Sequence, residues 1–130
     1  MPKSSSVFAI PAVLIAAFIG PNTCRADEEI KTLSPEAIQF FETKIRPVLV
    51  DQCYRCHSAE GQGVRGGLAV DSRDALLAGG ESGPAIVPGN LSDSTLWNAI
   101  NYEDYRMPPK NKLPESVIED FRKWIEMGAP

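Results

Sequence analysis

The feature that most constrains the fold of this chain lies near its middle, in the cluster Cys53-Tyr54-Arg55-Cys56-His57. It contains two cysteines separated by two residues, followed at once by the only histidine of the 130-residue sequence. Two cysteines three positions apart on one helical turn point to the same side. A chain of this length has room for one small domain and little else.

Three kinds of site use cysteine and histidine at close spacing. Structural zinc needs four ligands, but the chain has no second Cys-x-x-Cys and no His-x-x-x-His, and adjacent Cys56 and His57 fit poorly around one tetrahedral ion. A thioredoxin-like dithiol is expected near a βαβ pattern, and no alternating or β-branched run precedes Cys53. The third possibility is covalent haem, for which Cys-x-x-Cys-His is the attachment signature.

The spacing has a physical reason in the case of haem. Cysteines on one helical turn can reach the two vinyl groups of a single porphyrin, and the histidine that follows then lies beneath the iron as its proximal ligand. The sequence therefore favours one haem c, attached through Cys53 and Cys56 and ligated by His57, over the zinc and dithiol alternatives.

The N-terminus predicts export. Residues 7–20 form an apolar run of 14 residues behind Lys3, which is shorter than the roughly 20 residues of a membrane span and matches the core of a secretory signal. Small Ala26 marks the expected cleavage site. We therefore predict a signal peptide over residues 1–26, a linker over 27–34 and a haem domain over 35–130. Retention as a membrane anchor stays open, whereas lipid attachment at Cys24 is disfavoured because the residues before it do not match a lipoprotein signal.

Cleavage would change both the charge and the cysteine content. Loss of Lys3 and Arg25 would take the net charge from −4 to −6, and such an acidic surface argues against nucleic acid and anionic membrane as partners. Cys24 would leave with the signal. The expected location is the periplasm or another extracytoplasmic space, where a free cysteine pair would tend to form a disulfide.

The remaining sequence predicts helices joined by loops. The first helix should start with Ser34 as N-cap and Pro35 in its first turn, and Pro47 should kink or split it. Its buried face is expected to contain four apolar residues, Ile38, Phe41, Ile45 and Leu49.

Three shorter helices are expected further along. One is capped by Asp71 and ends at Gly79, and another starts near Ser92 or Asp93. The last ends at Gly128 and carries an apolar stripe of Val117, Ile118, Phe121, Trp124 and Ile125. Stretches rich in glycine and proline separate these helices, and no run predicts a strand with any strength. The predicted fold class is therefore all-α.

The order of these segments resembles the planctomycete-type cytochrome c domain over roughly residues 40–130. The likeness rests on "FETKIRPVLVDQCYRCHS", "GGL", "GPAIVPG", "RMPP" and "WIEMGAP". It implies a small class I cytochrome c-like helical domain wrapped around one covalently attached haem. Cys53 and Cys56 match the thioether positions of that family, and His57 and Met107 match its axial positions. The resemblance also implies that such a domain often stands at the head of a longer secreted protein.

With both axial positions filled, the iron has no open site for a substrate, so we expect a one-electron carrier and not an enzyme. Its partner would be a redox protein or a secreted enzymatic module, and a membrane only if the N-terminal segment is retained. Two alternatives stay open. The distal position could be open or displaceable, as in a haem-based sensor or a peroxidase-like site, or the haem could be a structural module of a larger secreted protein.

Several residues are expected to surround the haem. A backbone carbonyl of the loop at Pro84 is a candidate acceptor for the Nδ1 proton of His57, because metal-bound histidines usually have such a partner. Tyr102, Tyr105 and Arg106 flank Met107 and are candidates for contact with a haem propionate.

Overall fold

The structure is a computed structural model that describes residues 34–130. The predicted signal peptide at residues 1–26 and all but the last residue of the predicted linker lie outside the described residues. No helix in the described part of the chain is long and apolar enough to cross a bilayer.

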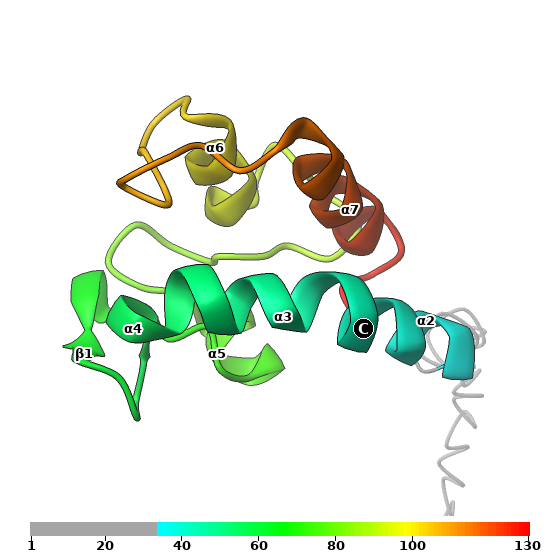
Figure 1. The fold of residues 1–130 in the computed structure, drawn as a ribbon, viewed down its shortest axis with the longest axis horizontal. Coiled ribbons are helices and arrows are strands. Elements are labelled where there is room, and N and C mark those ends of the chain that lie inside the picture. Colours follow the sequence, from blue (N-terminus) through cyan, green and yellow to red (C-terminus); the bar gives the residue numbers. More distant parts are fainter. Residues whose placement is uncertain (1–33) are drawn as a thin grey trace, which may run out of the picture.

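One helical run leads from the start of the described chain to the Cys-x-x-Cys-His cluster (Figure 1). Its consecutive segments are α2 (Pro35–Phe40), the π-helical η1 (Phe41–Ile45), α3 (Arg46–Val48), the π-helical η2 (Leu49–Cys53) and α4 (Tyr54–His57). Ser34 is the N-cap of α2, and its hydroxyl accepts a hydrogen bond from the Ala37 amide at 3.2 Å. The predicted start of this helix is confirmed.

Pro47 divides the helical run without breaking it. Proline has no amide hydrogen, and Pro47 lies in the first turn of α3, where no amide hydrogen is needed. The amides of Arg46 and Tyr54 bond to the carbonyls of Phe41 and Leu49, five residues back. Each such turn holds one extra residue and rotates the following residues by about 100° relative to an uninterrupted α-helix.

This rotation corrects one part of the predicted buried face. Ile45 and Leu49 are buried as expected, but Ile38 is 43% exposed and Ala37 is buried in its place. The extra residue of η1 lies between the two halves of the predicted face. A stripe with a constant period therefore cannot stay buried along its whole length.

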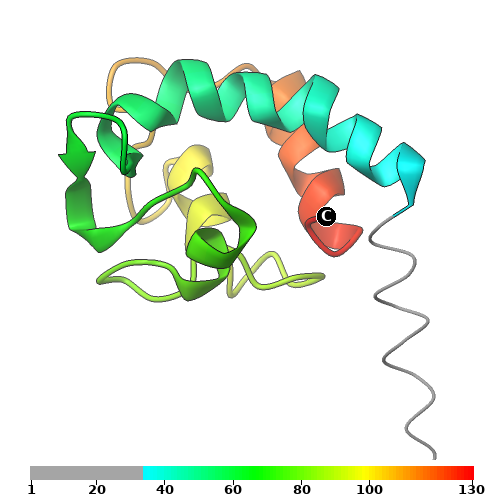
Figure 2. The same ribbon diagram turned by 90° about the horizontal axis from the view of Figure 1, so that it is seen from below.

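The rest of the chain forms short elements. They are β1 (Gly63–Val64), the 3-10 helix η3 (Arg65–Gly67), α5 (Arg73–Ala78), α6 (Thr95–Asn101) and α7 (Glu115–Glu126). The two-residue strand was not predicted, and it pairs with His57, the last residue of the cluster, and with Ser58 directly after it. Figures 1 and 2 both place β1 at the α4 end of the helical run. The residues that the structure describes are mostly helical and form no larger sheet, which confirms the all-α class.

Two predicted helix starts were wrong. Ser72, not Asp71, caps α5, because its hydroxyl accepts from the Ala75 amide at 3.1 Å. Helix α6 begins only after Ser94. The earlier candidates Ser92 and Asp93 instead donate hydrogen bonds to the Asn90 side chain, at 2.9 and 3.2 Å. A local turn therefore competes with the helix for these residues.

The core forms where α7 packs against η1 and α6. Helices α6 and α7 lie on the same side of the helical run, with α5 on the other side in Figure 1. The buried residues of α7 are Ile118, Phe121, Trp124 and Ile125, while Val117 is only partly buried. The predicted apolar stripe and the core role of Phe121 and Trp124 are confirmed.

Candidate functional site

A single cleft brings together all four residues that the sequence singled out. Cys53, Cys56, His57 and Met107 all line it. The cysteines and the histidine come from the end of the helical run, whereas Met107 comes from the loop between α6 and α7. Residues that are 50 positions apart in the sequence therefore share one cavity of about 280 Å³.

The cleft has an apolar interior and a polar edge. Its apolar lining includes Leu68, Val70, Leu96, Ala99 and Ile100, all of them buried or half-buried. Its polar lining includes Gln52, Arg65, Glu81, Ser82 and Tyr105, and these residues are all exposed. A flat apolar group with polar substituents on one edge would fit this distribution.

The imidazole of His57 is held by a backbone carbonyl. Its Nδ1 lies 3.1 Å from the Leu68 carbonyl oxygen, and a second hydrogen bond of 2.7 Å runs from the Val70 amide to the His57 carbonyl. A proton on Nδ1 makes the first bond and leaves the lone pair of Nε2 free to bind a metal. The predicted partner, a carbonyl near Pro84, was wrong, because the Pro84 carbonyl accepts from Thr95 instead.

Leu68 was missed because a backbone carbonyl leaves no mark in the sequence. It belongs to the "GGL" segment that carried part of the family resemblance. The pairing of β1 with His57 and Ser58 folds this segment back onto the cluster.

No disulfide joins Cys53 and Cys56. Burial raises the pKa of the Cys53 thiol to about 11, which disfavours the thiolate that thiol exchange uses. No three His, Cys, Asp or Glu side chains within residues 34–130 are grouped so that they could hold a metal ion. Neither observation favours the zinc or the dithiol alternative.

The loop that carries Met107 is fastened mainly to α6. The Met107 amide donates to the Ala99 carbonyl at 3.1 Å, and the Tyr102 hydroxyl donates to the Pro108 carbonyl at 2.6 Å. Met127 packs against the hydrophobic core at the end of α7 and does not line the cleft. Of these two methionines, only Met107 can reach a group bound there.

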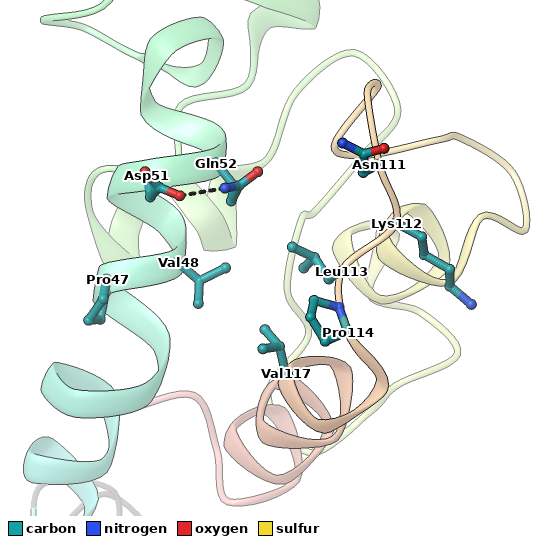
Figure 3. Close-up of a pocket in the computed structure, with 9 residues that line it drawn as sticks. All are labelled: Pro47, Val48, Asp51, Gln52, Asn111, Lys112, Leu113, Pro114 and Val117. Carbon is teal, nitrogen blue, oxygen red and sulfur yellow. Dashed lines mark hydrogen bonds between the residues drawn. The ribbon is translucent and has the colours of Figure 1, made fainter.

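Outside this cleft, a second hollow lies between the helical run and the chain that enters α7 (Figure 3). Val48 faces Leu113, Pro114 and Val117 across it, and Pro47 lines it from the same helical run. It contains no cysteine, histidine or methionine, so it offers no ligand for iron.

The donor set of the cleft fits haem. Two thiols and an imidazole come from one end of the helical run, a thioether comes from a separate loop, and the interior between them is apolar. Together with the all-α fold, this arrangement defines a c-type cytochrome domain, in which Cys-x-x-Cys-His is the attachment signature.

Comparison with known families identifies the domain more closely. Residues 53–111 match the family model described as planctomycete cytochrome C. The match runs from Cys53 to beyond Met107 and so includes all four candidate residues. Residues 53–111 therefore belong to a planctomycete-type cytochrome c domain, a class of domain that binds haem. Searches of the curated proteins and of the solved structures found no match.

Proposed function

We propose that this domain carries single electrons through one haem. Cys53 and Cys56 would form thioether bonds to it, and His57 and Met107 would be its axial ligands. The observation that carries the proposal is the presence of Met107 in the same apolar cleft as the Cys-x-x-Cys-His cluster. When bound, haem supplies a centre that accepts and releases one electron.

Residues of the chain would set the ligand strength, the exposure to water and the reduction potential of this haem. The Leu68 carbonyl orients His57 and increases its basicity as a ligand. The buried side chains of Val70, Leu96 and Ile100 exclude water from the cleft, and a neutral thioether from Met107 raises the reduction potential. With both axial positions filled, no site is left for a substrate, so we propose a carrier and not an enzyme.

The proposed location is the periplasm or another extracytoplasmic space, and the proposed partner is a redox protein or a secreted enzymatic module. Contacts between redox partners are usually small and transient. The net negative charge of the chain supports a protein partner over nucleic acid.

A second candidate function is a haem site whose distal ligand can be displaced, as in a sensor or a peroxidase-like protein. Met107 lies on a loop and not within a helix, and one backbone hydrogen bond, to the Ala99 carbonyl, holds its amide. This weak attachment of the loop favours the second candidate. The property to measure is therefore how readily an external ligand displaces Met107 from the iron.

Replacement of methionine by leucine tests the proposal, because leucine keeps a similar volume and lacks the sulfur. In the holoprotein, Met107→Leu should abolish the weak red absorption band of sulfur-to-iron coordination and admit carbon monoxide to the reduced protein. It should also lower the reduction potential by on the order of 100 mV, since axial ligands set haem potentials over a range of about 0.8 V.

Met127→Leu is the matched control and should leave the spectrum and the potential unchanged. A pyridine haemochrome assay of the wild type gives the haem type and the number of haems per chain. If wild type and Met107→Leu bind carbon monoxide equally well, Met107 does not close the distal position, and the second candidate function replaces the first.

A further inference from the structure

One hydrogen bond links the Met107 loop to a second segment that lines the cleft. The hydroxyl groups of Ser82 and Tyr105 lie 3.0 Å apart, and both residues line the cleft. Within residues 34–130, every other hydrogen bond between two side chains joins residues at most four positions apart. The Ser82–Tyr105 bridge spans 23 positions, so it joins two separate segments of the chain, whereas the other side-chain hydrogen bonds are local.

The Ser82 end of the bridge belongs to a rigid turn. The backbones of Gly80 and Gly83 exchange two hydrogen bonds, of 3.1 and 3.0 Å, and the Glu81 amide donates to the Gly66 carbonyl at 2.9 Å. The turn lies so close to η3 that a Cβ atom on Gly80 would be 2.4 Å from the Gly66 carbonyl oxygen. Ser82 is thus held in a fixed place.

The Tyr105 end belongs to the loop that carries the proposed ligand, two residues before Met107. In the described structure, every other hydrogen bond of residues 102–109 either stays within this loop or returns to α6. The bridge to Ser82 is therefore the only hydrogen bond that connects the loop to another part of the domain.

We propose that Ser82 and Tyr105 are positioning residues that form a latch on the Met107 loop. This inference rests on the proposed ligation by Met107. When Met107 leaves the cleft, its loop must move away from the fixed Gly80–Gly83 turn and the bridge must break. The latch therefore opposes the replacement of Met107 by an external ligand, and a hydrogen bond of ordinary net strength changes such an equilibrium by roughly two- to tenfold.

The test measures the affinity of the oxidised holoprotein for imidazole, which competes with Met107. Ser82→Ala and Tyr105→Phe should each increase this affinity by roughly two- to tenfold, and the double variant should bind no more tightly than either single variant. Hydrogen exchange of residues 102–109 should become faster in the same three variants. Ser92→Ala is the matched control, because its hydroxyl bonds to Asn90 in a turn outside the cleft.

Met107→Leu provides the upper limit of imidazole affinity. If the wild type already reaches that limit, Met107 is not a ligand, and both the ligation and the latch are wrong. If Met107→Leu binds far more tightly but Ser82→Ala and Tyr105→Phe behave like the wild type, the latch alone is wrong.

Two further outcomes would overturn the latch. An effect of Tyr105→Phe without an effect of Ser82→Ala would mean that the tyrosine hydroxyl acts on another group, such as a haem propionate. A lower melting temperature with unchanged imidazole affinity would mean that the bridge serves stability only. Tyr105 is 50% exposed and phenylalanine keeps its ring, so the variant should fold.

Discussion

At the scale of single residues, His57 depends on a backbone group that lies eleven positions away. The Leu68 carbonyl accepts the proton of Nδ1 and so fixes the tautomer that presents Nε2 to iron. Any residue at position 68 has a carbonyl oxygen. Another apolar residue could therefore replace Leu68 and keep this hydrogen bond, as long as the segment keeps its path.

Covalent attachment is the most direct prediction at this scale. The double variant Cys53→Ala/Cys56→Ala should leave no haem on a denaturing gel stained for haem, because neither thioether can form. Each single variant should keep one thioether and some stain. Cys24→Ser is the control, since Cys24 lies outside the residues that match the family model, and it should retain full staining. Covalent haem in the double variant would disprove the assignment.

At the scale of elements, the helical run places the cluster through changes in its hydrogen bonding. Pro47 predicted an interruption, and one is present as short π-helical segments on either side of α3. Cys53 ends the second of these segments. The direction in which the cysteines point therefore depends on η1 and η2, which the apolar periodicity of the sequence does not reveal.

The substitution Gly79→Ala tests how closely the end of α5 packs against the turn that holds Ser82. Its φ of 72° and ψ of −158° are open essentially to glycine alone, and a Cβ atom there would lie 1.9 Å from the Gly83 carbonyl oxygen. We expect Gly79→Ala to lower the free energy of unfolding by about 3 kcal/mol or more, as measured by chemical denaturation of the holoprotein.

Gly89→Ala separates the two causes of this loss. Gly89 also has a positive φ, of 75°, but a Cβ atom there would meet nothing within 4 Å. Backbone strain alone should cost about 1 kcal/mol. Equal losses in the two variants would show that the close approach of Gly79 and Gly83 does not matter.

At the scale of the whole molecule, Trp124 connects distant parts of the chain. Its ring lies 5.5 Å from that of Phe41 and 6.1 Å from that of Phe121, measured between centroids. Its indole nitrogen donates to the Pro130 carbonyl at 2.8 Å. One side chain thus joins η1, α7 and the chain that follows α7.

Trp124→Phe should therefore destabilise the domain by about 2 kcal/mol, from the lost hydrogen bond and the cavity left behind. Trp97→Phe is the control. Trp97 is half-buried, and its indole nitrogen makes no hydrogen bond within residues 34–130, so the loss should be less than about 1 kcal/mol. Denaturation midpoints of the two holoproteins provide the comparison. Similar losses would contradict the central role given to Trp124.

The sequence by itself determined what depends on residue type and short spacing. The Cys-x-x-Cys-His cluster indicated haem, the stripe of α7 indicated a buried helical face, and Ser34 indicated a helix start. Met107 was selected through the family resemblance. The structure places it in the cleft, while its bond to iron stays a prediction.

The tertiary structure alone decided the contacts that join distant segments. Two examples are the Leu68 carbonyl beside His57 and the hydrogen bond between Ser82 and Tyr105. In both, the two partners are far apart in the sequence, and no helical or strand periodicity predicts that they meet. Backbone carbonyls are the same at every residue, and exposed hydroxyl groups occur throughout the sequence. Only the folding of β1 and of the Gly80–Gly83 turn brings these particular groups within hydrogen-bonding distance of their partners.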